Sequence, residues 1–278
     1  MKLTTTVNVE APSRPLSLSD RIMTLGSCFA DSIAEKMSAA GFQVCANPFG
    51  ALYNPMSVES AVRRLDSGRT FTREDCVRMG AGAGLICSFE HHTSFARASE
   101  EEFLDNANGH LAGAAAFWSS ANVVIITLGT AFVWYHDKRP VSNCLKLPAR
   151  EFERRMLDAS EAAAALKAVI DSHPEKRFIL TVSPIRHMGD GAHANALSKA
   201  RLLLAAESAA ADYFPAFEIM MDELRDYRFY AEDLVHPSPT AVSIIWERFL
   251  DSYTDPAERS AIEANEKAAR LSAHRKIL

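Results

Sequence analysis

Three nearly continuous apolar runs divide the chain, and each is followed by small or polar residues. They lie at residues 22–25, 122–129 and 178–182. Runs of this kind are typical of strands that are covered on both faces in a parallel sheet. Weaker runs at 41–46 and 213–221 predict two further strands, and Pro215 favours an edge position for the last. The pattern therefore predicts five strands.

The segments between these runs place apolar side chains at helical spacing. In the first of them, Phe29, Ile33 and Met37 share one face before Gly41. Further helices are expected at about 57–65, 100–117, 151–172, 195–212 and from residue 239 onward. Strands that alternate with helices favour an α/β fold built on a parallel sheet.

The pattern also divides the chain into parts. Residues 1–20 are expected to form an N-terminal arm, residues 21–253 an α/β domain, and residues 254–278 a polar helical tail. Within the domain, residues 67–120 are the least regular part and are expected to hold an insertion. A second excursion is expected at residues 134–150.

Composition narrows the classes of protein. The 278 residues carry a net charge of −5 without a long basic run, so no nucleic-acid partner is expected. No segment approaches the roughly 18 apolar residues of a membrane helix, and the N-terminus lacks the apolar core of a signal peptide. The five cysteines are odd in number and form no CxxC motif, which favours reduced thiols. A cytoplasmic location is expected, and the oligomeric state stays open.

Cofactor and metal sites are not expected from the motifs. The glycine-rich run at residues 80–84 lacks the GxGxxG spacing of a dinucleotide-binding turn. The adjacent His91 and His92 lack a third ligand at usable spacing. No cofactor and no metal are therefore predicted.

Ser27 follows Gly26 between the first apolar run and a helix. On such a turn a serine hydroxyl lies at the carboxyl edge of the sheet. Its amide lies at the positive end of a helix, where developing negative charge is stabilised. The alternative is that Ser27 only caps the helix.

A second motif, Asp233 followed three residues later by His236, precedes a helix that Ser238 would cap and Pro239 would begin. An imidazole that is oriented by a carboxylate can take the proton of a serine. The alternative is a surface loop with an incidental histidine.

Together the motifs resemble a known family. TLGSCFADSI and DLVHPS are similar to the opening and closing blocks of SGNH hydrolases. NPFGALYNP at 47–55, TLGTAFVW at 127–134, SPIRHMGDG at 183–191 and DELRDYRFY at 222–230 resemble its GSCFA branch. The resemblance implies a flavodoxin-like, three-layer α/β/α sandwich around a central parallel five-stranded sheet. It also implies a serine-centred site for acyl-ester chemistry.

The resemblance implies roles for single residues. Ser27 would be the nucleophile, His236 the base and Asp233 its orienting carboxylate, and the amides of Ser27 and Gly50 would bind the oxyanion. The family usually has Gly-x-Asn where this chain has Gly129, Thr130 and Ala131. Because alanine has no donor, the replacement is left open among Thr130, Asn54 and a histidine of the insertion. Leu145 stands where a histidine of the GSCFA branch is expected.

Further residues are candidates for substrate contact. They are Asn54, His91, His92, Gly129, Arg186 and His187. A solvated loop is the alternative for the histidine pair, and a salt-bridged loop is the alternative for Arg186 and His187.

Three functions remain open. The first is a serine esterase acting on small-molecule or saccharide acyl esters, with O-acetyl groups on carbohydrate as the candidate substrate. The second is an O-acyltransferase with the same triad, and the third is a non-catalytic binding module. Cys28 is a rival nucleophile, since a helix N-terminus lowers a thiol pKa. It is expected to point away from His236.

Overall fold

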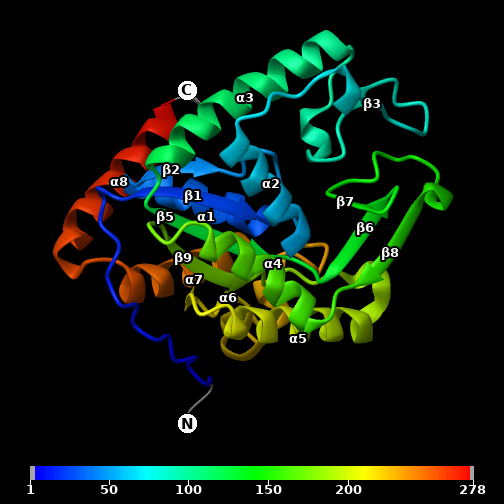
Figure 1. Ribbon diagram of the computed structural model, residues 1–278. Helices are drawn as coiled ribbons and strands as arrows, with labels where there is room; N and C mark the ends of the chain where they lie inside the picture. The colour runs from blue at the N-terminus through cyan, green and yellow to red at the C-terminus, as the bar shows by residue number, and fades with distance from the viewer. Residues whose placement is uncertain (1–3, 276–278) are drawn as a thin grey trace.

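A five-stranded parallel sheet forms the centre of the molecule in the computed structural model, which describes residues 4–275 (Figure 1). The strand order is β10-β9-β5-β1-β2, and the pairs are parallel throughout. The strands are β1 (Arg21–Gly26), β2 (Gln43–Ala46), β5 (Val123–Leu128), β9 (Arg177–Val182) and β10 (Asp212–Tyr213). The predicted five-stranded sheet is confirmed.

Helices cover both faces of this sheet (Figure 1). One face packs against α1 (Cys28–Ala40), α7 (Pro239–Tyr253) and α8 (Arg259–Arg275). The other packs against α2 (Pro55–Ser67), α3 (Glu100–Ser120), α4 (Ala159–Asp171) and α5 (Gly191–Ser208). Neighbouring strand residues alternate between the two cores, as Ile22 and Met23 do. The predicted three-layer α/β/α sandwich is therefore confirmed.

A separate antiparallel sheet of three strands projects from one side of the sandwich, at the right of Figure 1. It consists of β6 (Phe132–His136), β7 (Arg139–Val141) and β8 (Phe152–Met156), in the order β7-β6-β8. The prediction that a helix begins at residue 151 is therefore wrong, because β8 occupies residues 152–156. The helix begins only at Ala159, where Asp158 and Glu161 form a capping box.

The strand expected over 213–221 is also wrong. Strand β10 ends at Tyr213 and is followed by the short helix α6 (Ala216–Glu218) and a π-helical turn (Ile219–Glu223). Pro215 accounts for the difference, because it has no amide hydrogen with which to continue the ladder.

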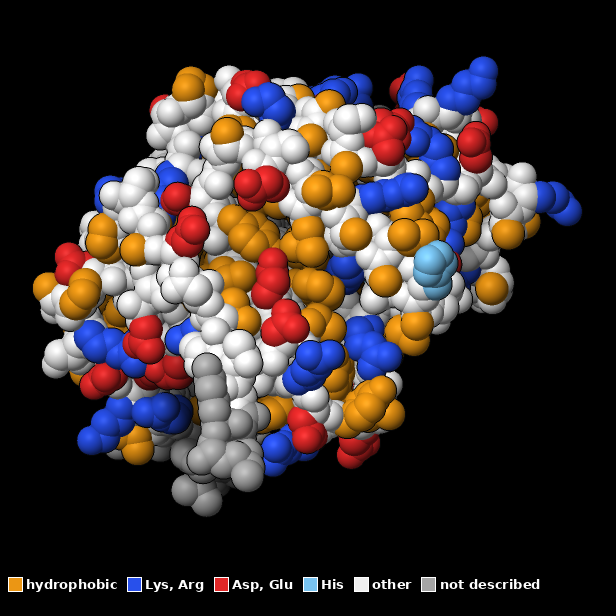
Figure 2. All heavy atoms as spheres, turned by 90° about the horizontal axis from the view of Figure 1, so that it is seen from below, with side chains coloured by type: hydrophobic (Ala, Val, Ile, Leu, Met, Phe, Trp, Pro, Cys, Tyr) orange, Lys and Arg blue, Asp and Glu red, His pale blue; other side chains and the backbone are white. Residues whose placement is uncertain are grey.

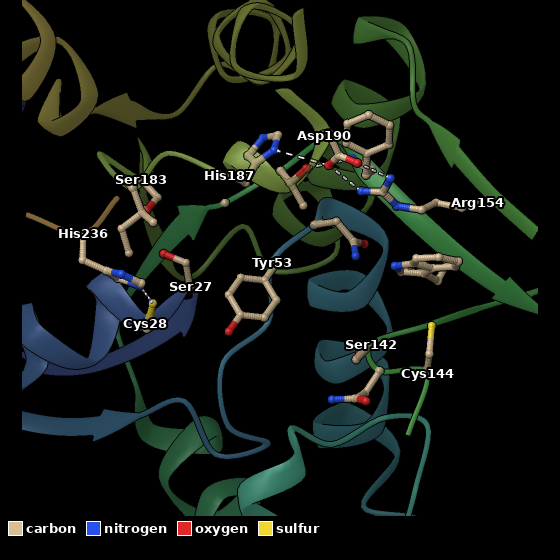
Figure 3. Close-up of a pocket in the computed structure, with 17 residues that line it drawn as sticks. Ser27, Cys28, Tyr53, Ser142, Cys144, Arg154, Ser183, His187, Asp190 and His236 are labelled. Atoms are coloured by element: carbon tan, nitrogen blue, oxygen red, sulfur yellow. Dashed lines mark hydrogen bonds and ion pairs between the residues drawn. The ribbon is translucent and has the colours of Figure 1, made fainter. Parts of the chain in front are cut away.

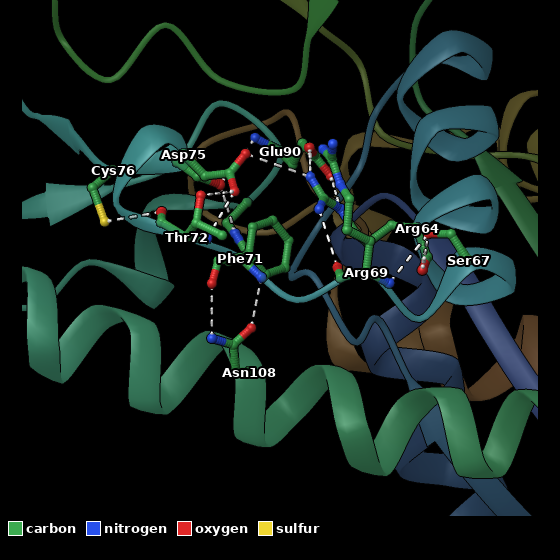
Figure 4. Close-up of polar contacts among 11 residues, drawn as sticks. Arg64, Ser67, Arg69, Phe71, Thr72, Asp75, Cys76, Glu90 and Asn108 are labelled. Carbon is green, nitrogen blue, oxygen red and sulfur yellow. Dashed lines mark hydrogen bonds and ion pairs between the residues drawn. The ribbon is translucent and has the colours of Figure 1, made fainter.

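Between α2 and α3 the chain forms two short strands and two 3-10 turns. These are β3 (Val77–Arg78), β4 (Ile86–Cys87), η1 (Arg73–Asp75) and η2 (Thr93–Phe95). A polar cluster around Arg64 holds this segment to α2 (Figure 4). The Arg64 side chain is only 4% exposed, and its guanidinium bonds to Glu90 and to the Arg69 carbonyl and lies 3.6 Å from Asp75. Asn108 of α3 holds both backbone groups of Phe71.

The C-terminal helix α8 is docked on the sandwich. Ile262 is fully buried, Asn265 donates to the Ala40 carbonyl, and Glu266 accepts from the Trp246 indole. The N-terminal arm is joined to the same region, where the backbone of Leu16 bonds to Tyr253 at the end of α7 and to Asp255 just after it. Seen from below, the surface mixes hydrophobic side chains with charges of both signs (Figure 2). Within residues 4–275, no helix has the length and apolar character needed to span a bilayer.

Candidate active site

A cavity of about 460 Å³ opens at the carboxyl edge of the central sheet. Five segments that are far apart in the sequence line it (Figure 3). They are the turn between β1 and α1, the start of α2, the end of β5 with the projecting sheet, the loop after β9, and the loop before α7. Ligands of open α/β sheets bind at this edge.

Ser27 is placed in this cavity by the turn that ends β1. Gly26 has a φ of +144°, and a Cβ there would lie 2.2 Å from the Thr127 carbonyl oxygen, so only glycine fits. Ser27 occupies the N-cap position of α1, but its side chain makes no capping hydrogen bond. The Oγ atom is buried and has no hydrogen-bond partner among the described residues. The hydroxyl is therefore left unengaged, which the capping alternative does not explain.

His236 is fixed by Asp233 at the mouth of the cavity. Its Nδ1 lies 2.6 Å from Asp233 Oδ2, and Asp233 Oδ1 accepts the amides of Val235 and His236. These amides and the imidazole lower the pKa of Asp233 to about 2. An ionised Asp233 accepts a hydrogen bond from Nδ1–H, which leaves Nε2 as the ring nitrogen that faces the cavity.

The loop that carries His236 is held from the β9 side. Leu234 adopts a left-handed conformation with a φ of +56°. Arg186 donates to the Leu234 carbonyl from its side chain and to the Val235 carbonyl from its amide, each at 3.2 Å. Arg186 does not line the cavity and lies instead against the rings of Tyr227 and Tyr230. The structure thus places it as a support of this loop, not at the predicted substrate contact.

Cys28 does not point away from His236, so that expectation is wrong. His236 Nε2 lies 3.7 Å from Cys28 Sγ, and both residues line the cavity (Figure 3). Burial raises the pKa of the Cys28 thiol, so the effect of burial outweighs that of the helix N-terminus. Ser27 and His236 line the same cavity, but Ser27 Oγ is not hydrogen-bonded to the ring in this state.

The three groups predicted to bind an oxyanion have internal partners. All three amides donate to backbone carbonyls. The Ser27 amide bonds to the Thr127 carbonyl at 3.0 Å, the Gly50 amide to that of Asn47 at 2.7 Å, and the Thr130 amide to that of Tyr53 at 2.7 Å. Gly50 does not line the cavity, and a Cβ on it would lie 2.5 Å from the Cβ of His92.

Other donors near Ser27 are free. Asn54 lines the cavity, and its Oδ1 accepts the Ser57 amide while its Nδ2 forms no hydrogen bond within residues 4–275. The amides of Cys28 and Phe29, in the first turn of α1, also lack backbone acceptors in the described part of the chain. Sequence reasoning named Asn54 but missed these two amides, although every helix leaves its first amides without partners.

Neither histidine of the predicted pair reaches the cavity. His91 is 1% exposed, bonds to Ser88 Oγ at 2.7 Å and is surrounded by four phenylalanine rings. Burial, with a smaller contribution from Arg64, lowers its pKa to about 3. His92 uses its Nδ1 to cap a short 3-10 turn at Ser94. Both residues are structural in their contacts, because the insertion folds onto the sandwich and not over the cavity.

Gly129 and His187 do line the cavity. Gly129 lies against Ser27, since a Cβ added to it would be 3.4 Å from the Cβ of Ser27. His187 bonds through Nε2 to Ser198 Oγ at 3.1 Å. Burial, followed by the nearby charge of Lys199, lowers the pKa of His187, so the ring is neutral at pH 7.

The wall opposite Ser27 was missed at the sequence level. It comes from the projecting sheet, with Phe132 and Trp134 on β6 and Arg154 on β8. Arg154 binds both oxygens of Asp190, at 2.6 and 2.7 Å, and its guanidinium lies 4.0 Å from the Phe132 ring centroid. The alternation of Phe132 and Trp134 was the available signal, because it has the period of a half-buried strand. Leu145, at the position of an expected histidine, is fully buried.

Comparisons with known proteins agree with the sequence motifs. The GSCFA family model matches residues 21–249. No curated protein sequence is significantly similar to the chain. Among solved structures, a catalytic variant of the acetylxylan esterase Axe2 from Geobacillus stearothermophilus is 10% identical, with a TM-score of 0.43 over 87% of this chain and 100% of that one. A carbohydrate esterase family 2 enzyme from Corynascus thermopiles (Myceliophthora fergusii) is 14% identical, with a TM-score of 0.40 over 91% and 68% of the two chains. Similarities of this size concern the fold alone.

Proposed function

The chain belongs to the GSCFA family, and from this premise we propose that it is a serine esterase of the SGNH type. Its substrates are small-molecule or saccharide acyl esters, and O-acetyl groups on carbohydrate are the candidate class. One observation carries the proposal: an unengaged, buried serine hydroxyl shares a cavity with a histidine that an ionised carboxylate orients. This is the combination that nucleophilic catalysis by serine requires.

In the proposed reaction, His236 Nε2 takes the proton of Ser27 as Oγ attacks the ester carbonyl. The Ser27 hydroxyl and the ring must first come into hydrogen-bond contact, which requires Nε2 to exchange its 3.7 Å contact with Cys28 for Ser27. Catalytic hydrogen bonds often tighten only when substrate is bound. Asp233 stabilises the imidazolium that forms. His236 then donates the proton to the leaving alcohol, and water releases the acyl group from Ser27.

The oxyanion is assigned to donors whose N–H groups have no carbonyl or carboxylate acceptor within residues 4–275. We place it between Asn54 Nδ2 and the first-turn amides of α1, at Cys28 and Phe29, where the helix dipole adds to the attraction. Asn54 then replaces the asparagine that is missing at Ala131. The amides of Ser27 and Gly50 would have to break hydrogen bonds within the protein to take this role.

Labelling with a fluorophosphonate probe tests the nucleophile. Ser27→Ala is expected to abolish labelling, and Cys28→Ala to leave it intact. The contact between Cys28 Sγ and His236 Nε2 favours a second candidate, in which the thiol is the nucleophile. The reverse labelling pattern would establish that candidate and overturn the first.

An O-acyltransferase would use the same residues, with a sugar hydroxyl in place of water. Short-chain aryl esters and acetylated sugars, each with and without an added acceptor, separate the two activities. Release of free acid without acceptor supports the esterase, and acylated acceptor as the main product supports the transferase. Equal rates for the wild-type protein and His236→Ala would favour a non-catalytic binding module.

A further inference from the structure

Lys199 is a buried cation that the proposed reaction has not used. It lies on α5 and is 1% exposed. None of the carboxylates in residues 4–275 forms an ion pair with it, although buried lysines are usually paired. Burial of an unpaired ammonium is costly, and it lowers the pKa of Lys199 to about 7. A cost of this kind is often associated with function.

The ammonium is anchored directly behind the cavity wall. Its Nζ donates to the carbonyl of Gly129 at 2.7 Å and to that of Ser183 at 2.8 Å. These residues follow the ends of β5 and β9, and both line the cavity. Gly129 in turn lies against Ser27. Gly129 therefore lies between the Lys199 ammonium and Ser27.

The charge of Lys199 reaches the groups around the site. It acts to lower the pKa of the Cys28 thiol on α1, against the larger opposing effect of burial, and it adds to the effect of burial in lowering the pKa of His187 on the loop before α5. Cys28 in turn acts to raise the pKa of Lys199, and the Phe217 ring centroid lies 5.7 Å from Nζ. Because Lys199 is buried, the field of its charge is weakly screened there.

We propose that Lys199 is an electrostatic positioning residue for the reaction at Ser27. It fixes the two strand ends that form the cavity wall. It also holds a positive charge behind them, which stabilises the negative charge that forms on the substrate carbonyl. This deepens the proposed esterase function and rests on it. It also supplies, through space, part of the stabilisation that the family's asparagine would give where this chain has Ala131.

Two substitutions separate the charge from the anchoring. Lys199→Gln keeps two N–H donors for the two carbonyls but has no charge, whereas Lys199→Met keeps neither. Lys167→Gln, on the surface of α4 beside Asp171, is the matched control. The first measurement is the alkylation rate of Cys28 by iodoacetamide against pH, followed by mass spectrometry. It does not depend on esterase activity.

Loss of the charge is expected to raise the Cys28 pKa and to slow its alkylation about threefold at pH 6.5, where most Lys199 side chains are protonated because their pKa is about 7. With an aryl acetate, Lys199→Gln is expected to lower kcat about tenfold and to change KM less than twofold. Lys167→Gln is expected to change neither measurement.

A Lys199→Gln protein that matches the wild type in Cys28 alkylation and in kcat overturns the proposal, since anchoring alone would then suffice. If Lys199→Met fails to fold, the glutamine variant still decides. Failure of the esterase proposal is distinguishable: hydrolysis would then survive Ser27→Ala, while the alkylation profile would still show whether the charge of Lys199 reaches the site.

Discussion

Two loops of this protein present a histidine in opposite environments. In the loop at residues 88–92, His91 is enclosed by phenylalanine rings and held by Ser88. In the loop at 233–236, His236 is about half exposed and is held by the carboxylate of Asp233. His91 has a neutral hydrogen-bond partner and is only 1% exposed, so its charged form is strongly disfavoured. His236 has an anionic partner, and its Nε2 lies at the cavity, 3.7 Å from Cys28 Sγ, which suits the proposed transfer of a proton to and from this ring.

The largest expected difference between the loops is in catalysis. His236→Ala is expected to lower kcat for an aryl acetate about 10³-fold, because the general base is lost. His91→Ala is expected to leave kcat within about threefold of the wild type and to lower the free energy of unfolding by about 3 kcal/mol, through the cavity and the unpaired Ser88. Steady-state kinetics and urea unfolding measure the two effects. Equal kinetic losses in both variants would erase the contrast.

The second difference is in the pH dependence of stability. The pKa of His91 is lowered from 6.5 to about 3 on folding, so below pH 6.5 the unfolded chain binds a proton that the native protein does not. The free energy of unfolding is therefore expected to fall by about 2.5 kcal/mol between pH 7 and pH 4.5 from this group. Asp233 contributes nothing in that window, because its stabilisation is lost only as pH falls from 3.8 through about 2. Urea unfolding at both pH values measures the change.

His91→Gln is the control for this effect. It keeps a hydrogen-bonding side chain beside Ser88 but does not titrate. The variant is expected to be less sensitive to acid than the wild type, whatever its stability at pH 7. An unchanged pH slope in His91→Gln would show that another group is responsible.

The smallest expected effect concerns Arg186, which supports the His236 loop as Arg64 supports the His91 segment. Arg186 holds the His236 loop by its carbonyls, and Arg64 holds the His91 segment through Glu90. Arg186→Ala is expected to lower kcat about tenfold, since a misplaced base loses part of its catalytic contribution. KM and the melting temperature should change little. Partial recovery in Arg186→Lys would support positioning, and a loss of folded protein would contradict it.

The central sheet could be predicted because its strands are buried on both faces and appear in the sequence as aliphatic runs. The projecting sheet was missed for the converse reason. Its strands are short and half exposed, so they show no such runs. The turn between β6 and β7 consists of Asp137 and Lys138, with φ values of +48° and +63°. An Asn-Gly or Asp-Gly pair would have indicated such a turn, but Asp-Lys does not.

The candidate site divides in the same way. Ser27, Asp233 and His236 stand in local motifs that the sequence displays, and all three remain predicted catalytic residues. The burial of His91 depends on rings at Phe49, Phe71, Phe95 and Phe103, which only the folded chain brings together. The neighbours of Lys199 lie 16 and 70 positions away, so nothing in the local sequence marked it.

Gly26 has a consequence for engineering this protein. The backbone before the nucleophile approaches Thr127 so closely that no side chain can be accommodated. A saturation library at this codon, screened for folded protein alone, should return a single amino acid. The fraction of clones that carry a residue other than glycine at position 26 would then measure how many misfolded proteins such a screen lets through. This measurement needs no substrate.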